Sequence, residues 1–528
     1  MRVRNFRRIR RALPRRCNHA RMHVTIPSAA LVGIEAVRCD VEVSVQTRGL
    51  PRICLVGLPD LAIRESIERI RSAMAASGFD PPRHRTTVSL APADLRKHGP
   101  AFDLPIALGL LLASPGCPEG ASRRPDASRW LVAGELGLDG ALRGVRGAVG
   151  MALLARGLGL DGLVLPAACA PEAAIVEGID VRAADALPAV LAHFLGQAPL
   201  PRVEPVDVRA AIGEARPTVD FRDIRGQSVA KRALLVAACG GHNALLIGPA
   251  GCGKTMMARA MPGILPVLEP DEALEVTRIM SAAGAGGGLA VERPFRAPHH
   301  TASTVALVGG GASGVPRPGE VTLAHHGILF MDELPEFGRS ALEALREPLE
   351  DGFITVARAH GSARFPARSL LVAAMNPTAR GNRLGGTAGV REERRYMERV
   401  SGPIVDRIDL HVEVPAVPFE RLADAPAGAT SEELRAEVAR VRCAQRARQG
   451  PTLNAHLRSR ALDDVAPLDP TGRRLLGDAL ERLGLSARAY DKVRRVARTV
   501  ADLERSGAVR AEHVAEAIQY RVLDRHAA

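Results

Sequence analysis

Residues 248–255 read Gly-Pro-Ala-Gly-Cys-Gly-Lys-Thr and directly follow an apolar run at 243–247. An apolar strand, a glycine-rich turn and a helix, in this order, form a phosphate-binding loop. The glycines let backbone N–H groups wrap around a phosphate, and the helix start presents its positive end to the same anion. Lys254 is predicted to reach the β- and γ-phosphates of ATP, and Thr255 to bind Mg²⁺. The predicted ATP-binding residues are Gly248, Pro249, Ala250, Gly251, Cys252, Gly253, Lys254 and Thr255.

Two later apolar runs also end in polar side chains. The run at 327–331 ends in Asp332 and Glu333. Asp332 is predicted to hold Mg²⁺, directly or through water, and Glu333 to orient and deprotonate the attacking water. The run at 370–375 ends in Asn376, which is predicted to position that water and resembles the sensor 1 residue of AAA+ ATPases. The alternatives are a strand end with solvated acids and a turn asparagine before proline.

Two arginines complete the predicted catalytic set. Arg407 resembles the arginine finger of AAA+ ATPases, which reaches the γ-phosphate of the neighbouring subunit, and Arg488 resembles the sensor 2 residue. Arg399 competes with Arg407 for the first role, and Arg494 or Arg495 competes with Arg488 for the second. Ordinary surface ion pairs are the alternative for each. A finger that acts on a neighbour implies a ring or another assembly.

Residues 22–197 form the first of the regions that must position these side chains. The segment 41–45 alternates between apolar and polar residues as a strand does. Isoleucines at 63, 67 and 70, followed by Met74, form the apolar face of a helix that Asp60 can cap. Further strands are predicted near 86–90, 130–134 and 162–165. We therefore expect an α+β domain here.

The remaining chain divides into a linker and two further regions. Residues 198–218 contain several prolines and are predicted to be a linker. Residues 219–415 carry the phosphate chemistry and are expected to form an α/β core with a parallel sheet. Residues 416–528 are predicted to be a helical lid, in which Thr430 and Glu433 open one helix as a capping box. The expected fold class is a multidomain α/β protein.

The bulk composition is that of an ordinary globular protein of 528 residues, 46% of them hydrophobic. The eight cysteines include no Cys-x-x-Cys pair, so the sequence suggests neither zinc nor disulfides, and we expect a cytoplasmic protein. The apolar run at 104–113 is too short to cross a membrane. An aromatic fraction of only 3% does not support a base-stacking platform for single strands.

The net charge of +13 is concentrated at the amino terminus. Residues 1–22 contain nine arginines and no acid, which leaves +4 for the other 506 residues. We interpret residues 1–21 as a disordered basic tail or as the product of a misassigned start, with Met22 as the alternative first residue. An Arg-rich tail of this kind is also able to contact nucleic acid or acidic lipid.

Several longer motifs make the chain resemble a known family. Residues 294–303, Pro-Phe-Arg-Ala-Pro-His-His-Thr-Ala-Ser, and the segment 323–337 resemble the magnesium-chelatase-like AAA+ proteins. Residues 57–60 and 91–105 resemble more narrowly the ComM/YifB family, and the likeness extends from about Met22 to Leu523.

This resemblance implies an ATP-dependent ring, a hexamer, that binds single-stranded or branched DNA. It implies a helicase that promotes branch migration in recombination during natural transformation. It also implies an insertion at about 284–319 and a hairpin at about 352–365. If this hairpin lines a pore, Arg358, His360 and Arg364 are the expected DNA contacts. A solvated hairpin with ordinary charges is the alternative.

The first domain resembles a ribosomal-protein-S5-like fold found in Lon-type proteases. Lon-like enzymes have a Gly-Pro-Ser segment with a lysine further on, whereas residues 99–103 here read Gly-Pro-Ala-Phe-Asp and no lysine follows Gly144 in the matching stretch. Without a nucleophile or a base, we expect no protease activity.

A cysteine motif of many relatives is also absent after the sensor asparagine. Residues 378–381 read Thr-Ala-Arg-Gly where those relatives have Cys-Pro-Cys-Gly. The pairs His299–His300 and His325–His326 are not expected to replace a metal site, because adjacent residues of a strand face opposite ways.

Two other functions compete with a DNA-remodelling motor. One is the motor subunit of a magnesium chelatase, which resembles residues 219–525 but lacks the amino-terminal domain. The partner subunit's Asp-x-Ser-x-Ser motif does not occur in this chain. The other is a protein-remodelling or scaffold ATPase with the first domain as adaptor.

Overall fold

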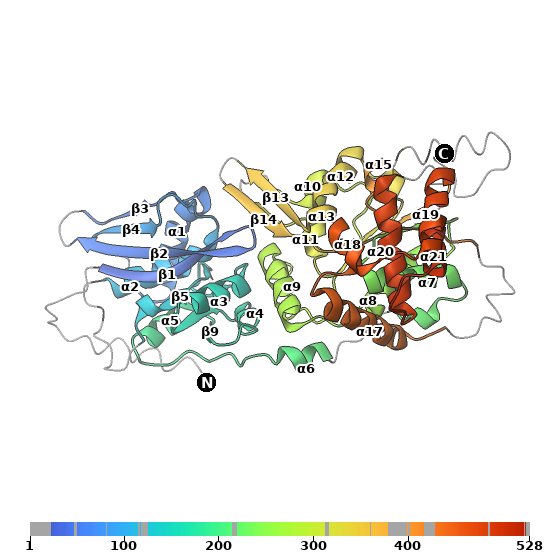
Figure 1. Cartoon of the computed structure of the whole chain (residues 1–528). Coiled ribbons are helices and arrows are strands. Elements are labelled where there is room, and N and C mark those ends of the chain that lie inside the picture. Colours follow the sequence, from blue (N-terminus) through green and yellow to red (C-terminus); the bar gives the residue numbers. More distant parts are fainter. Residues whose placement is uncertain are drawn as a thin grey trace.

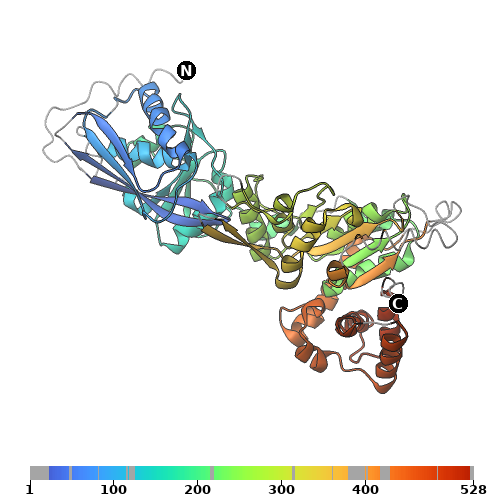
Figure 2. The ribbon, with the colours of Figure 1, turned by 90° about the horizontal axis from the view of Figure 1, so that it is seen from above.

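A computed structural model gives the fold, which is elongated, with an amino-terminal part at one end and a helical carboxyl-terminal part at the other (Figures 1 and 2). The central part lies between them. The residues that the structure describes are 23–46, 50–80, 82–114, 117, 125–213, 219–311, 316–358, 361–378, 396, 399, 402–416, 428–483, 486–521 and 523.

The amino-terminal part contains a four-stranded sheet in the order β1-β2-β4-β3. The β1–β2 and β2–β4 pairs are antiparallel, whereas β3 and β4 are parallel. In β2 every second residue from Cys39 to Val45 is buried, which confirms the alternation read from the sequence. The bounds are β1 His23–Val32, β2 Glu35–Gln46, β3 Arg52–Val56 and β4 Arg85–Ala91.

Two helices pack in the same core. Helix α1, Leu61–Ala76, begins after Asp60, whose Oδ1 accepts a hydrogen bond from the Ile63 N–H at 2.8 Å, so the predicted cap is confirmed. Ile63, Ile70 and Met74 are fully buried. Helix α2, Asp103–Leu112, is buried along nearly its whole length and contacts β1 and β2.

A second sheet in the amino-terminal part is parallel, in the order β5-β8-β9. It contains two of the strands predicted from the sequence, near 130 and 162. The elements of this part are β5 Trp130–Val132, β6 Glu135–Leu136, β7 Leu142–Arg143, α3 Ala148–Gly157, β8 Gly162–Pro166, α4 Ala170–Ala173, β9 Asp180–Ala184 and α5 Leu187–Phe194. The mixed α/β content agrees with the sequence, while the S5-like assignment stays a prediction.

The central part is built on five parallel strands in the order β11-β12-β15-β10-β16. Strands β10, β12 and β15 are buried along their whole length, as strands covered on both faces must be. Their carboxyl ends open at one edge of the sheet, where the polar residues predicted from the sequence follow. The bounds are β10 Ala244–Ile247, β11 Phe295–Arg296, β12 Ile328–Met331, β15 Leu370–Met375 and β16 Leu410–Glu413.

The segment 284–319, which was expected to be an insertion, contributes to this sheet. It contains β11, the edge strand of the sheet. The described helices of the central part are α7 Ser228–Gly240, α8 Lys254–Ile264, α9 Pro270–Ala283, α10 Thr304–Val308, α11 Glu320–Leu323, α12 Arg339–Ala344, α13 Arg346–Asp351 and α15 Gly402–Val405.

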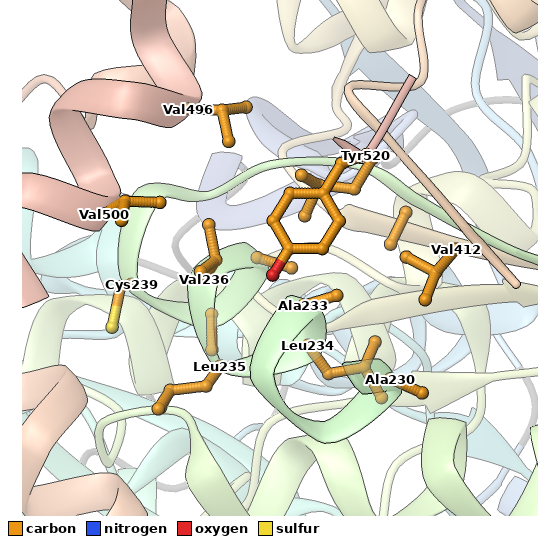
Figure 3. Packing of buried hydrophobic residues seen from close by; sticks show 14 of the residues in the cluster. Ala230, Ala233, Leu234, Leu235, Val236, Cys239, Val412, Val496, Val500 and Tyr520 are labelled. Carbon is orange, nitrogen blue, oxygen red and sulfur yellow. The ribbon is translucent and has the colours of Figure 1, made fainter. Parts of the chain in front are cut away.

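The carboxyl-terminal part is helical, as predicted. Thr430 and Glu433 form the expected reciprocal capping box at the start of α17. Val496 and Val500 of α20 pack against α7 and lie near Tyr520 and Val412 in one apolar cluster (Figure 3). The helices are α17 Ser431–Gln449, α18 Ser459–Val465, α19 Pro470–Leu483, α20 Ala487–Leu503 and α21 Ala511–Gln519.

An antiparallel hairpin, β13 Phe353–Arg358 with β14 Gly361–Pro366, extends from the central part to the β1–β2 turn (Figures 1 and 2). Ile34 of that turn lies in one apolar cluster with Val356 and Phe365 of the hairpin. A Cβ atom on Gly33 would lie 2.9 Å from the Ala363 Cβ, so the two parts are in close contact here.

Helix α9 makes a second junction with the amino-terminal part. Arg278 pairs with Glu35 of β2 at 3.0 Å, and the Ser281 hydroxyl donates a hydrogen bond to Glu172 at 2.7 Å. The stretch predicted as a linker contains α6, Val208–Gly213, which packs through Ile212 on residues next to and within α9. Part of the predicted linker is therefore helical.

Among the described residues, no helix combines the length and the hydropathy that a membrane crossing requires.

Candidate nucleotide-binding site

The loop between β10 and α8 has the backbone geometry of a phosphate cradle. Gly251 and Gly253 adopt left-handed conformations, with φ of 77° and 93°. A Cβ atom on either residue would meet no atom within 4 Å, so open space borders the loop. Helix α8 then begins at Lys254, with its amino-terminal end at the loop.

Lys254 places a positive charge in this loop without a negative partner. Its side-chain Nζ donates hydrogen bonds to the carbonyl oxygens of Gly248 and Pro249, at 2.6 and 2.8 Å, and to the Asn376 Oδ1 at 3.1 Å. All three acceptors are uncharged, and no carboxylate pairs with Lys254 in the described part of the chain. Because the residue is only 8% exposed, its ammonium has little contact with water and pairs with no carboxylate among the described residues, so a bound anion would stabilise it.

Thr255 and Asp332 meet beside this lysine. The Thr255 hydroxyl donates a hydrogen bond to the Asp332 Oδ2 at 3.0 Å. A hydroxyl and a carboxylate are the hard oxygen ligands that Mg²⁺ prefers, so the donor set fits this ion. The structure therefore brings together Lys254, Thr255, Asp332 and Asn376, as predicted, at the carboxyl ends of three adjacent strands.

Glu333 lies at the same edge but points to a different partner. Its φ of 52° is left-handed, which is uncommon for a residue with a side chain, and its N–H donates to the Asp332 Oδ1 at 3.0 Å. Its carboxylate Oε2 lies 3.2 Å from the Nδ1 of His300. The contact between His300 and Glu333 was not predicted from the sequence. His300 stood out there only as a member of the 294–303 motif.

The two predicted arginines lie at the opposite edge of the sheet. Arg407 precedes β16, and its carbonyl accepts a hydrogen bond at 3.1 Å from the side chain of Asn243, which precedes β10. The Arg407 side chain is largely buried and pairs with Glu350. Arg488 lies 3.6 Å from Asp406, beside Arg407. Neither arginine reaches the phosphate loop of its own chain.

The competing arginines are engaged elsewhere. Arg399 pairs with Glu336 at 3.1 Å, on the segment that follows Glu333. Arg494 is buried and pairs with Asp463 at 2.8 Å. Arg495 donates a hydrogen bond to the Leu457 carbonyl at 2.9 Å, within the helical part.

Of the expected DNA contacts on the hairpin, only Arg364 has a described side chain. The Arg358 side chain and His360 lie outside the described residues. Arg364 is exposed, and its guanidinium stacks 3.5 Å from the centre of the Phe353 ring. The neighbouring residues Ala363 and Phe365 are buried and lie next to Gly33 of the β1–β2 turn, whereas Arg364 between them is exposed.

The two histidine pairs correct one expectation. Neither lies in a strand, and the rings within each pair are about 4 Å apart, so the reason given for their separation was wrong. His325 and His326 both approach Glu275, with nitrogen–oxygen distances of 3.2 and 2.9 Å. These contacts hold the pKa of Glu275 well below its usual value.

This cluster is poorly suited to a metal ion in the described arrangement. The Nδ1 of His325 accepts a hydrogen bond from the Arg368 N–H at 2.9 Å, so the proton of the neutral ring lies on Nε2. A metal ligand needs an unprotonated nitrogen, and Nε2 is the atom that faces Glu275. Burial lowers the pKa of His325, which favours this neutral form.

Three family descriptions match this chain. Residues 220–422 match "Magnesium chelatase, subunit ChlI", residues 41–169 match "Subunit ChlI of Mg-chelatase", and residues 428–521 match "Magnesium chelatase, subunit ChlI C-terminal". The first match includes the phosphate loop and both strands that end in acids or asparagine.

Whole-chain relatives are similar over nearly the full length. The chain is 41% identical to the uncharacterized protein YifB of Salmonella typhimurium, over 95% of this chain and 97% of that protein. It is 41% identical to the competence protein ComM of Haemophilus influenzae, over 94% and 97%. The chloroplastic magnesium-chelatase subunit ChlI of Chlamydomonas reinhardtii is 28% identical over 31% of this chain and 46% of its own length. The chain therefore belongs to the ComM/YifB family of magnesium-chelatase-like ATPases.

Proposed function

We propose that this protein hydrolyses ATP and uses the energy to remodel DNA. The observation that supports the ATP site is the buried Lys254, which pairs with no described carboxylate and lies in an open loop at a helix start. A triphosphate supplies the anion that this ammonium lacks. On binding, Lys254 exchanges its loop carbonyls for phosphate oxygens.

The neighbouring residues support hydrolysis rather than binding alone. Glu333 accepts a proton from water as the water oxygen bonds to the γ-phosphorus and the bond to the β-phosphate oxygen breaks, which gives ADP and phosphate. Asn376, whose Oδ1 lies 3.1 Å from the Lys254 Nζ, positions the attacking water. Mg²⁺, held by Thr255 and Asp332, would neutralise the charge that develops on the phosphates.

The position of the arginines favours a site shared between subunits. Arg407 and Arg488 lie at the amino-terminal edge of the sheet, whereas the phosphate loop lies at the carboxyl-terminal edge. A neighbouring copy of the chain is able to use this edge, so we propose a homo-oligomeric ring, a hexamer. Arg407 must then leave Glu350 to reach the neighbour's γ-phosphate.

The DNA part of the proposal has a separate basis. It rests on membership of the family of a competence protein and on the exposed Arg364 of the hairpin. Promotion of branch migration by a helicase is the finer form of this proposal. The competing functions, a chelatase motor and a protein-remodelling ATPase, use the same ATP site and differ in their partner.

Turnover of ATP by the purified full chain, with and without branched DNA, tests the proposal. We expect Lys254→Ala to lose nucleotide binding, and Glu333→Gln to bind ATP while losing turnover. Linear duplex of matched length and composition is the control for branched DNA. Turnover in Glu333→Gln equal to that of the unaltered protein would reject Glu333 as the base.

The proposed binding of DNA is tested separately from the hydrolysis of ATP. Contacts to phosphates make binding fall steeply with salt, by about 10³–10⁵ between 50 and 200 mM for six to ten contacts. If the protein hydrolyses ATP but DNA neither binds nor stimulates it, the ATPase stands and the DNA function is wrong. Stimulation by an unfolded protein would then favour the remodelling alternative.

A further inference from the structure

A cavity of about 780 Å³ lies where the amino-terminal part meets the central part. One side is formed by the start of α1, the loop 96–101 and the loop before α3, and the other by α9 and the segment 316–318. The volume is within the range of pockets that bind small molecules, roughly 300–1,000 Å³, and domain junctions are common places for them. No residue of the phosphate loop lines it, so the cavity is separate from the ATP site.

Three arginines line this cavity from distant segments of the chain: Arg96, Arg146 and Arg317. Arg96 and Arg146 belong to the amino-terminal part, and Arg317 belongs to the central part. The Arg146 side chain lies against the loop after α9, because a Cβ atom on Gly284 would be 2.7 Å from its Nε. None of the three guanidinium groups has an ion pair or a hydrogen bond within the described part of the chain. Both sides of the junction therefore offer a positive charge to an anion.

The acids of the lining, in contrast, have partners in their own part of the molecule. Asp60 accepts hydrogen bonds from two backbone N–H groups, at 2.8 and 3.2 Å. Glu65 of α1 and Glu135 of β6 both lie near the Arg69 guanidinium. Carboxylates repel a strand that carries a phosphate on every nucleotide, but they accept hydrogen bonds from hydroxyl or amino groups of a small molecule.

The rest of the lining is mostly apolar. Leu31, Val145 and Met151 contribute from the amino-terminal part, and Ala282 contributes from α9. An apolar surface of this kind packs against a base or a sugar ring, while arginines bind phosphate through paired hydrogen bonds. Inorganic phosphate alone would leave most of the volume unfilled. A small molecule with a phosphate at one end and a polar ring at the other matches all three features.

We propose that this cavity binds a small phosphorylated molecule of the size of a nucleoside monophosphate. Its phosphate pairs with Arg146 and Arg317, and its hydroxyl or amino groups donate hydrogen bonds to Glu65 or Glu135. Because the phosphate is held from both sides, the bound molecule links the amino-terminal part to the central part. The cavity lies outside the ATP site, so this inference does not depend on the proposed hydrolysis.

Calorimetric titration of the full-length Lys254→Ala chain tests the proposal, since this substitution weakens binding at the phosphate loop. The probes are adenosine 5′-monophosphate, guanosine 5′-monophosphate and ribose 5-phosphate, and the unphosphorylated nucleosides are the controls. We expect at least one probe to bind with a Kd below about 1 mM, and the nucleosides to bind at least about tenfold more weakly. Absence of binding by all three probes, or equal binding of the nucleosides, would overturn the proposal.

Substitutions of the arginines in the same chain locate the bound probe. Arg146→Ala and Arg317→Ala should each weaken binding by about 10- to 100-fold, the effect of losing a hydrogen bond to a charged group. Arg156→Ala is the matched control, because Arg156 is an exposed residue of α3 that donates to the Glu177 carbonyl at 3.3 Å and does not line the cavity. Equal weakening in Arg156→Ala would assign binding to the overall charge and contradict the proposal.

A variant that fills the cavity separates the site from general attraction of anions. Ala62 of α1 lines the cavity, and Ala62→Phe reduces its volume without changing any charge. We expect this variant to lose binding of the probe. Unchanged binding would place the probe elsewhere and overturn the proposal. Thermal unfolding shows whether the variant is folded, and the arginine variants decide the matter if it is not.

A single-stranded oligonucleotide distinguishes DNA from a small molecule as the source of the phosphate. We expect it not to compete with the probe, because its further phosphates would meet the acids of the lining. If the oligonucleotide displaces the probe and loses affinity in Arg146→Ala and Arg317→Ala, these arginines are a DNA contact and the small-molecule site is wrong.

Discussion

At the scale of single residues, the nucleotide site was predicted from polar residues that directly follow apolar runs in the sequence. A side chain that directly follows a buried parallel strand must lie at the carboxyl edge of the sheet, so Asp332 and Asn376 were placed correctly without any knowledge of the fold. His300 could not be found in this way. Its contact depends on the pairing of β11 with β12, which are separated by more than thirty residues of loop and short helices.

The trans role of Arg407 gives a prediction at this scale. A finger supplied by a neighbour contributes about 10³–10⁵-fold to turnover in comparable enzymes. We expect Arg407→Ala and Lys254→Ala to be inactive separately and to regain part of the activity when mixed. In the mixture, an intact phosphate loop in one subunit meets an intact Arg407 in the next.

The mixing ratio is varied while turnover and the assembly state are measured. Arg495→Ala is a matched arginine control, because Arg495 bonds within the helical part of its own chain. Absence of restored activity at every ratio, with both variants still assembled, would contradict the trans role.

At the scale of elements, the sequence predicted most strands and helices but not how the parts meet. The alternation in β2 and the apolar face of α1 follow from burial on one side, which the residues record directly. The packing of the β13–β14 hairpin on the β1–β2 turn could not be predicted from the sequence. The apolar residues of the hairpin show that one side is buried, but they do not identify what covers it. The edge strand β11 was likewise hidden in a segment expected as an insertion.

Helix α17 shows why basic residues were hard to interpret. Its side chains of Arg435, Arg440 and Arg442 donate hydrogen bonds to carbonyls at or near the ends of three other helices, at Gly263, Leu503 and Ala238. A cation near a helix carboxyl end is favourable because of the helix dipole. These arginines therefore stabilise the packing of the helical part on the central part.

Gly33 provides a prediction for the junction of the hairpin with the amino-terminal part. Its φ is 64°, and an added Cβ would lie 2.9 Å from Ala363. Gly33→Ala should therefore destabilise the protein by about 1–3 kcal/mol through backbone strain and crowding together. Thermal unfolding and limited proteolysis measure the effect.

Gly78 is the control for this substitution. It also has a left-handed backbone, with φ of 81°, but a Cβ there would meet nothing within 4 Å. Gly78→Ala thus reports backbone strain alone. Equal losses of stability in the two variants would mean that crowding against the hairpin does not contribute to the loss in Gly33→Ala.

At the scale of the whole molecule, the sequence predicted an α/β protein with a helical end. The elongated arrangement of the three parts became visible only in the structure (Figure 2). The order of parts follows from composition along the chain. Their relative placement does not, because it depends on contacts such as Arg278 with Glu35 that join residues far apart in sequence.

Buried histidines predict how the stability of the whole chain responds to acid. Burial lowers the pKa of His193, His325 and His411 below the ordinary value of about 6.5. In the unfolded chain these groups take up protons at a higher pH than in the folded chain. Stability therefore falls as the pH drops below about 6.5, before most carboxylates titrate.

We expect the midpoint of thermal unfolding to fall by about 2–5 °C between pH 7 and pH 5.5. His193→Asn keeps an acceptor for the Leu200 N–H, which bonds to the His193 Nδ1 at 3.3 Å, and removes one titrating group. Its slope against pH should be shallower. A midpoint that does not change over this range would contradict the prediction.

The buried side of the hairpin also limits where the chain can be truncated for expression. A fragment that starts near Phe221 would keep the ATP site but remove Gly33 and the β1–β2 turn from Ala363 and Phe365, which are at most 6% accessible in the full chain. Such a fragment would tend to aggregate through this newly exposed apolar surface. Replacing the exposed apolar residues of β13 and β14 with polar ones would be needed to obtain a soluble ATPase fragment.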